Sequence, residues 1–388
     1  MSRWESWAPT AGAGHADPLV DRLLALVGKG RVFVLSRAEG RGAPRCLVQP
    51  DTTEATAATV RALRESGVPL HVVQTPPPFD PPDAPAGAVY LDLGRLTAVL
   101  AVDETNQSVS VQAGITWGRL EDLMMRRGST LGPVPVWLRN VAIAESVARN
   151  DRLRPSARYG QLLDAVLAVT AVLPTGAIAR TTVSPRRATG PELPAALLGT
   201  RHRNGVLCEV QLQIWRRSGE RPRASFTLPD WGAAEAFMRQ ALQAGVRPAL
   251  GVARGGVNGT GPVGLSLELA SAAEAVVLER LLKAAAVTPR ARHEALDAAL
   301  ASVEAGAVVP APFIAGLVPP ALLPGATALL PATNIWDLGG PWLSLWVDAP
   351  TDELTQHRLA ELGVRVPARL TGFEALGDAV TRALRNEG

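Results

Sequence analysis

An arginine–histidine–arginine cluster is the group of residues best suited to chemistry in this sequence. It lies in GTRHRNGVLCEVQLQIW, Gly199 to Trp215, where alternating apolar residues after Gly205 predict a buried strand. Arg201, His202 and Arg203 occupy the place where a tight glycine turn would normally stand. Such a cluster can bind an anion, for example a phosphate or a partner's carboxylate, or it can form a solvated turn. The residues alone leave both interpretations open.

The other reactive side chains favour no catalytic site. His293 and His357 stand alone on predicted helices, which is typical of solvated surface histidines rather than of a general base. Cys46 and Cys208 are the only cysteines, and no spacing of His, Cys or carboxylate residues is typical of a metal site. We therefore predict no metal and expect both thiols to be buried in a reducing compartment.

Composition limits the class of protein. The chain has 388 residues, of which 47% are hydrophobic and 19% charged, which predicts a globular protein with two domains. A formal net charge of +3 without a basic block argues against nucleic-acid binding. The first residues do not resemble a signal peptide, so we expect a cytoplasmic protein. The uncharged stretch 305–336 contains six prolines, which excludes a membrane-spanning helix.

Helical and strand periodicities alternate along the chain. We expect helices over Asp17–Val27, after Asp51 or Thr52, over Thr116–Arg126, within PELPAALLG, from Asp230, over 272–286, 291–305 and 372–385. Predicted strands include Val89–Leu91, a hairpin around 104–107, a second hairpin pairing 163–173 with 177–180, and the strand after Gly205.

Several segments resemble one family. VYLDLGRLTAVLAVDETNQSVSVQAGITWGRLEDLMMRRGSTLGPVP, PRCLVQPDTTEATAATVRALRESGVPL and SARYGQLLDAVLAVTAVLPTGAI follow the framework of the FAD-linked oxidases, which carry a PCMH-type FAD-binding domain. Within that family, the chain is most similar to alkylglycerone-phosphate-synthase and glycolate-oxidase-type flavoproteins. The resemblance implies an α+β fold, with a PCMH-type FAD-binding domain of two subdomains and an α/β cap domain. It implies four regions: an N-terminal helical extension (1–40), the FAD-binding domain (41–217), the cap or substrate domain (218–365) and a returning C-terminal helix (366–388).

The resemblance also implies where FAD would lie, because the family binds its diphosphate at glycine-rich turns. The first such turn here reads QTPPPFDPP, residues 74–82, in which five prolines lack N–H donors. At the second turn, Ala144 and Glu145 replace a glycine pair at the head of a helix. At the third, the Arg201–Arg203 cluster replaces a glycine. We therefore expect FAD to be absent or weakly bound.

Other positions match the family and define what a flavin would contact if one were bound: Gly114, Thr116, Tyr159, Gly160, Gly199 and Gly205. For Tyr159 we favour a structural hydroxyl over a residue lining the cofactor cleft. The catalytic residues are unassigned, because the second half of the chain contains no tyrosine and no His–His pair.

Two functions follow from these observations. The first is a degenerate member of the FAD-linked oxidase family that acts as a non-catalytic or accessory subunit, with an active paralogue or another subunit as its protein partner. The second is an active FAD-dependent oxidoreductase for a hydroxyl-bearing small molecule, such as a 2-hydroxy acid or a glycerone-phosphate-like compound. Tryptophans 336, 342 and 346 fit core packing first and a partner interface second.

Overall fold

The structure is a computed structural model. It describes residues 17–34, 45–73, 87–132, 136–149, 162–181, 199–217, 221–254 and 261–287, with shorter pieces that include 158–159, 193–197 and three late strands. The helices predicted at 291–305 and 372–385, the turn at 74–82, Gly160, His293, His357 and the side chains of Trp336, Trp342 and Trp346 lie outside the described residues.

The first sheet is mixed and carries two helices. Its elements are α1 (Pro18–Val27), β1 (Val32–Val34), β2 (Cys46–Val48), α2 (Thr53–Glu65), β3 (Leu70–Val72) and β4 (Val89–Leu91). The strand order is β1-β2-β4-β3, with β2 and β3 parallel to β4 and β1 antiparallel to β2. Of the two predicted caps of α2, Thr52 is the one used, because its hydroxyl accepts a hydrogen bond from the Ala55 N–H at 3.0 Å.

The second sheet is antiparallel and has five strands in the order β5-β6-β10-β8-β9. Its strands are β5 (Val99–Asp103), β6 (Ser108–Gln112), β8 (Val166–Val172), β9 (Ile178–Arg180) and β10 (Val206–Gln213). The accompanying elements are α3 (Trp117–Arg126), β7 (Ser129–Thr130), α4 (Val136–Arg139), α5 (Ile143–Arg149), α6 (Leu162–Ala165), α7 (Leu193–Leu197) and β11 (Trp215–Arg216). The hairpins around 104–107 and 174–176 form as predicted. The strand predicted to start at Leu163 was wrong by three residues, since α6 takes up its beginning.

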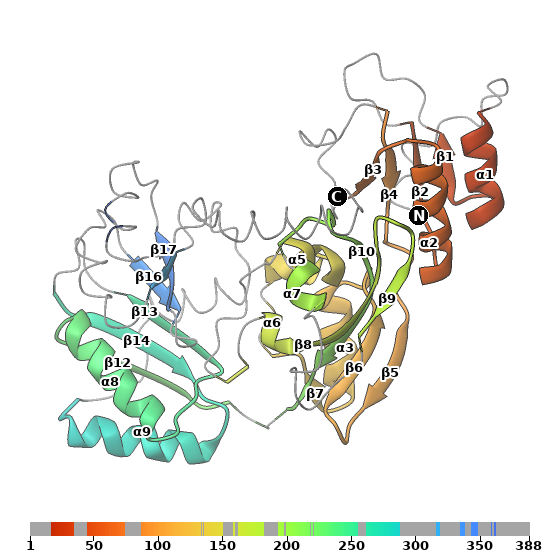
Figure 1. Cartoon of the computed structure of the whole chain (residues 1–388). Coiled ribbons are helices and arrows are strands. Elements are labelled where there is room, and N and C mark those ends of the chain that lie inside the picture. Colours follow the sequence, from red (N-terminus) through yellow and green to blue (C-terminus); the bar gives the residue numbers. More distant parts are fainter. Residues whose placement is uncertain are drawn as a thin grey trace.

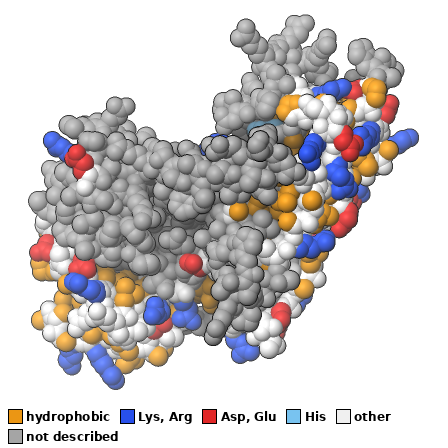
Figure 2. Space-filling view, viewed as in Figure 1, with side chains coloured by type: hydrophobic (Ala, Val, Ile, Leu, Met, Phe, Trp, Pro, Cys, Tyr) orange, Lys and Arg blue, Asp and Glu red, His pale blue; other side chains and the backbone are white. Residues whose placement is uncertain are grey.

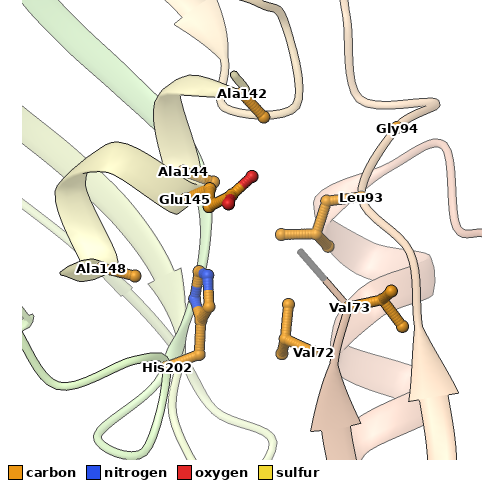
Figure 3. A pocket seen from close by; sticks show the side chains of 9 residues that line it. All are labelled: Val72, Val73, Leu93, Gly94, Ala142, Ala144, Glu145, Ala148 and His202. Atoms are coloured by element: carbon orange, nitrogen blue, oxygen red, sulfur yellow. The ribbon is translucent and has the colours of Figure 1, made fainter. Parts of the chain in front are cut away.

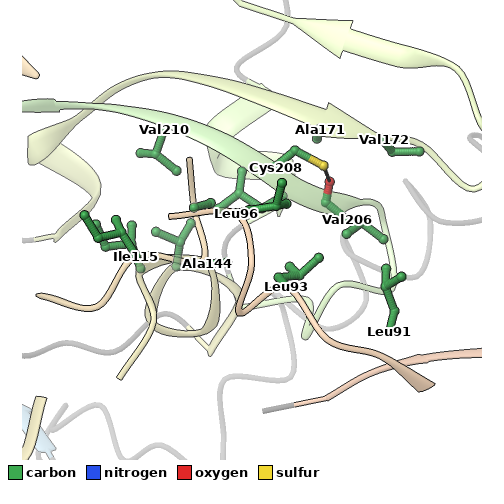
Figure 4. Close-up of a cluster of buried hydrophobic side chains, with 14 of the residues drawn as sticks. Leu91, Leu93, Leu96, Ile115, Ala144, Ala171, Val172, Val206, Cys208 and Val210 are labelled. Atoms are coloured by element: carbon green, nitrogen blue, oxygen red, sulfur yellow. Dashed lines mark hydrogen bonds between the residues drawn. The ribbon is translucent and has the colours of Figure 1, made fainter. Parts of the chain in front are cut away.

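One apolar core joins these two sheets. Residues from the first sheet and its following loop, including Leu91, Leu93 and Leu96, pack with Ile115 and Val210 of the second (Figure 4). Cys208 lies in this core, and its Sγ contacts the Val206 carbonyl oxygen at 3.5 Å. Burial raises the pKa of the Cys46 and Cys208 thiols to about 12.

The third sheet forms a separate lobe (Figure 1). Its elements are β12 (Arg223–Leu228), α8 (Trp231–Gln243), β13 (Leu250–Arg254), β14 (Val263–Glu268), α9 (Ala272–Ala284), β15 (Gly316–Val318), β16 (Asn334–Asp337) and β17 (Leu343–Val347). The strands are antiparallel in the order β12-β14-β13-β16-β17-β15. The helix predicted from Asp230 is α8, which begins one residue later because Asp230 is its N-terminal cap. The lobe has its own core, in which the Phe226 and Phe237 rings meet edge to face at 5.1 Å.

The α+β fold is therefore confirmed, with two larger sheets and the two-stranded β11–β7 sheet in one lobe and a capping sheet in the other. On the face seen in Figure 2, arginine and lysine side chains are interspersed with acidic ones. In the described part of the chain, no helix is both long and apolar enough to cross a bilayer.

Candidate functional site

A small pocket lies where the two sheets of the first lobe meet (Figure 3). Three segments far apart in sequence line it: the end of β3 with the loop after β4, the head of α5, and the turn before β10. Two of them, α5 and the pre-β10 turn, carry the replaced glycines predicted from the sequence. The lining residues are Val72, Val73, Leu93, Gly94, Ala142, Ala144, Glu145, Ala148 and His202.

The first wall of the pocket comes from the parallel strands β3 and β4, whose carboxyl ends meet at one edge of the sheet. Val72 and Val73 end β3, and Leu93 and Gly94 follow β4. The buried Asp92 carboxylate fixes this loop, because it accepts hydrogen bonds from the Gly94 N–H at 2.8 Å and the Gln49 side-chain amide at 2.7 Å. The wall is therefore rigid and mostly apolar.

The second wall is the first turn of α5. The N–H groups of Ile143 and Ala144 donate to the carbonyl oxygens of Ile115 and Ala113, at 3.0 and 2.7 Å. These two amides are consequently engaged within the protein. The Glu145 side chain is buried, forms an ion pair with Arg149 one turn later, and directs its carboxylate into the pocket. This part of the pocket therefore presents a negative charge.

The third wall is the predicted cluster, and it is a tight turn. Arg201 and His202 both have left-handed backbone conformations, with φ of 49° and 64°, which non-glycine residues adopt at a cost. Hydrogen bonds hold the turn: the Arg201 N–H donates to the Ala148 carbonyl at 2.8 Å, and the Asn204 side-chain amide donates to the Ala196 carbonyl at 2.8 Å. The three side chains of the cluster therefore have different surroundings. Arg201 and Arg203 are exposed, whereas the His202 side chain points into the pocket.

His202 lies beside Glu145 on one side of the pocket, with Val72, Val73 and Leu93 on the opposite side (Figure 3). Its Nδ1 is sealed from solvent and makes no hydrogen bond with any described residue. Burial lowers the pKa of His202 to about 4, a nearby His71 acts in the same direction, and a backbone hydrogen bond at Gly205 opposes both. The imidazole is therefore neutral near pH 7.

The space left between these walls is small. The cavity measures about 20 Å³, and one water molecule needs at least about 10–15 Å³ by the same measure. The walls around it offer a carboxylate, a neutral imidazole and apolar side chains, with the first amides of α5 already used. In this conformation, the described residues do not fit a diphosphate.

Gly114 and Thr116, two of the predicted flavin contacts, lie close to α5 and make contacts within the protein itself. A Cβ at Gly114 would lie 1.9 Å from the Leu93 carbonyl oxygen, so the glycine permits a close approach of two backbones. Thr116 caps α3 by accepting from the Arg119 N–H at 3.3 Å, and it bridges to Ala142. The glycines of the pre-β10 turn stand at its two ends, with Gly199 at φ 72° and Gly205 against the Val172 carbonyl oxygen.

Tyr159 is placed elsewhere, at the seam between the two lobes. Its ring meets Trp215 edge to face at 4.9 Å and lies against Gly132, where a Cβ would come within 3.0 Å. Its hydroxyl receives a long hydrogen bond of 3.5 Å from Arg221. The structure thus places Gly199, Gly205 and the Arg201–Arg203 cluster in one turn, of which His202 lines the pocket, and places Tyr159 elsewhere.

Comparison with known proteins places these features in a family. Residues 44–182 match the family described as an FAD-binding domain. The whole fold superposes on a solved alkyldihydroxyacetonephosphate synthase with a TM-score of 0.72, at 13% sequence identity over 97% of this chain and 84% of that one. Residues 44–182 thus form an FAD-binding domain of the FAD-linked oxidase family.

Members of the FAD-linked oxidase family also appear among the curated relatives. The alkyldihydroxyacetonephosphate synthase of Caenorhabditis elegans is 27% identical over 172 residues, which cover 44% of this chain and 29% of that protein. A D-lactate dehydrogenase of Anaerostipes hadrus is 28% identical over 182 residues, or 45% and 37%. The matched segment thus spans less than two fifths of either relative. A structure of p-cresol methylhydroxylase shares the fold with a TM-score of 0.65 and 13% identity, over 95% of this chain and 94% of that one.

Sequence reasoning did not find the apolar wall formed by Val72, Val73 and Leu93. These residues follow ordinary strand patterns, so no local signal distinguished them from other core positions. It also did not predict that His202 would be separated from its two arginines. The one sequence feature that could have indicated this separation is the loss of a turn glycine. Non-glycine residues in a left-handed turn are strained, and this strain restricts where their side chains can point.

Proposed function

We propose that this chain is a flavin-deficient member of the FAD-linked oxidase family that acts as a non-catalytic accessory subunit. One observation carries the proposal: the Glu145 carboxylate points into the pocket at the head of α5, where the family resemblance places a glycine pair beside the FAD diphosphate. The side chain takes up space and brings a negative charge to that position.

The Glu145 carboxylate would repel a diphosphate at this position. Two like charges about 4 Å apart repel by roughly 4 kcal/mol at an effective dielectric constant of about 20. The ion pair with Arg149 offsets part of that repulsion. Because a single neutral hydrogen bond contributes only about 1 kcal/mol, no one replacement contact would restore the affinity.

The engaged amides add to this effect. Diphosphates bind at glycine turns because free N–H groups can approach the oxygens closely. Here Ile143 and Ala144 donate to backbone carbonyls of the strand-to-helix connection before α3, which is part of the second sheet's frame. Freeing them would require breaking that connection.

Absorbance of the purified protein tests the flavin part of the proposal. The full chain is produced in a flavin-supplemented host and purified without denaturant. We expect no flavin bands, and no quenching of FAD fluorescence when micromolar protein is titrated into it. A yellow preparation that releases stoichiometric FAD on denaturation contradicts the proposal.

Variants of α5 test whether the side chains of Ala144 and Glu145 prevent FAD from binding. Ala144→Gly/Glu145→Gly removes both side chains, whereas Glu145→Gln removes the charge and keeps the volume. If charge is the main obstacle, both variants gain measurable FAD affinity over the wild type. If volume is the main obstacle, only the glycine variant does.

The accessory role needs a separate test, because it concerns a partner. The tagged chain is expressed from its native locus and the captured proteins are identified by mass spectrometry. A partner that carries the family's complete glycine turns and stoichiometric FAD supports the role. Oxidase activity in the isolated chain contradicts it.

An active flavoenzyme is the second candidate, favoured by the match of residues 44–182 to an FAD-binding domain. Its substrate would be a hydroxyl-bearing small molecule, such as the 2-hydroxy acid or glycerone-phosphate-like compound suggested by the names of the relatives. A yellow preparation bleached by D-lactate would favour this candidate.

A further inference from the structure

The two lobes have separate apolar cores within the described residues. One cluster runs from Leu19 to Ile214 and the other from Phe226 to Leu282, and they share no member. Lobes that meet without a continuous apolar interface are expected to move relative to each other unless other contacts hold them. Within the part of the chain that the structure describes, hydrogen bonds and ion pairs at the seam are therefore the contacts that hold the lobes in one orientation.

Glu268, the last residue of β14, lies at the centre of these contacts. Its side chain is only 8% exposed, and its two oxygens accept from two different arginines. Oε1 accepts from Arg221 at 2.9 Å, and Oε2 accepts from the Nη2 and Nε of Arg223 at 3.0 and 3.3 Å. Arg221 belongs to the connection between β11 and β12, and Arg223 is the first residue of β12, so one buried carboxylate fixes the end of the connection to the cap sheet.

Arg221 continues the chain of contacts into the first lobe. Its other terminal nitrogen donates to the Tyr159 hydroxyl, and Tyr159 is itself held between Trp215 and Gly132. Burial lowers the pKa of Arg221, but the hydrogen bond to Glu268 and the nearby Tyr159, Glu268 and Glu121 outweigh it, so the pKa is raised. The guanidinium therefore stays charged at the seam.

A second contact crosses the seam beside the first. Arg158, next to Tyr159, forms an ion pair with Glu274 in the first turn of α9 at 3.4 Å. Glu274 is 15% exposed and Arg158 is 35% exposed. Two tie points on neighbouring elements restrain rotation about the connection better than one point would.

We propose that Glu268, Arg221, Arg223, Arg158 and Glu274 form an ionic lock that holds the cap in one orientation on the first lobe. The lock is independent of whether flavin binds. Because removal of one partner leaves the other charges buried and unpaired, loss of the Glu268 charge releases the connection while each lobe keeps its own core. Release of the lock then lets the cap move as a rigid body.

Limited proteolysis with small-angle scattering tests the lock on the full chain. Trypsin cannot cut after Arg221, which precedes a proline, but it can cut the Arg217–Ser218 bond in the connection between β11 and β12. We expect Glu268→Gln to raise the rate of cleavage at that bond by about tenfold, and to increase the radius of gyration. Glu235→Gln is the matched control, because Glu235 is also largely buried yet pairs with Arg239 inside α8 alone.

A charge swap keeps the test valid if Glu268→Gln does not fold. Arg158→Glu is expected to raise the cleavage rate, and Arg158→Glu/Glu274→Arg to return it towards the wild-type value. Wild-type cleavage and an unchanged radius of gyration in both Glu268→Gln and Arg158→Glu would overturn the lock. So would a swapped pair that cleaves as fast as the single variant.

Discussion

Gly114 and Leu93 lie in backbone contact, so that a Cβ at position 114 would be only 1.9 Å from the Leu93 carbonyl oxygen. The contact joins the connection before α3 to the loop after β4, and therefore joins the two sheets of the first lobe. Gly114 matches a family position that would contact flavin, but this packing alone is a sufficient reason for a glycine there.

Gly114→Ala should therefore destabilise the protein whether or not flavin is present. The atoms that a Cβ would meet belong to the backbone of Leu93 and Leu96 and cannot rotate away, so we expect a loss of about 3 kcal/mol or more in the free energy of unfolding. Urea denaturation followed by circular dichroism measures it. Gly219→Ala is the control, because a Cβ at Gly219 meets no atom within 4 Å. Equal stabilities for the two variants would refute the packing argument.

In the turn at Arg201 and His202, a substitution by glycine is expected to maintain or increase the stability of the protein. Arg201 has a φ of 49°, which costs a residue with a Cβ roughly 1–2 kcal/mol, while glycine adds about 0.5–1 kcal/mol of chain entropy to the unfolded state. We expect Arg201→Gly to be neutral or stabilising by up to about 1 kcal/mol. Arg203→Gly, at a position without positive φ, should destabilise by about 0.5–1 kcal/mol. Thermal melts of both variants measure the difference in stability. A loss of stability in Arg201→Gly as large as that in Arg203→Gly contradicts the prediction.

Local signals in the sequence were sufficient for most of the secondary structure. The caps Thr52, Thr116 and Asp230 and the turn glycines marked where helices begin and hairpins close, because capping and turn formation depend on a few neighbouring residues. The family resemblance, rather than periodicity, supplied the arrangement of the sheets.

The candidate site was less accessible to sequence reasoning. Glu145 and His202 were noticed because they replace glycines, but their meeting in one pocket depends on the packing of α5 against β10. The Glu268 contacts had no sequence signal at all, since a glutamate that ends a strand is usually solvated. Long-range pairs of this kind are determined by tertiary structure.

The buried thiols predict resistance to modification. Both Cys46 and Cys208 are fully buried, and burial raises the pKa of each to about 12. Because the thiolate is the reactive form, we expect essentially no reaction with Ellman's reagent in the native state at pH 8 within minutes. Two thiols per chain should react in 6 M guanidinium chloride. Rapid reaction of the folded protein would show that the first lobe opens, and would contradict the described core.

The neutral His202 predicts a loss of stability in mild acid. Its pKa is about 4 in the folded protein, against an ordinary value of 6.5 for histidine, so the unfolded chain binds the proton first as the pH falls. The stability associated with His202 is therefore fully present above pH 6.5 and is lost as the pH falls towards 4. From pH 7.5 to pH 5 the loss amounts to about 2 kcal/mol.

Comparison of two variants isolates this effect from the other groups around the pocket, Glu145 and His71. His202→Gln cannot titrate, so its free energy of unfolding should fall between pH 7.5 and pH 5 by about 2 kcal/mol less than that of the wild type. His71→Gln should retain most of the wild-type slope, because His71 only adds to the effect that burial exerts on His202. Urea titrations at the two pH values measure both slopes. Parallel slopes for the wild type and His202→Gln would mean that the imidazole is solvated in the folded protein, and the pocket would then be open to water rather than closed by its own side chains.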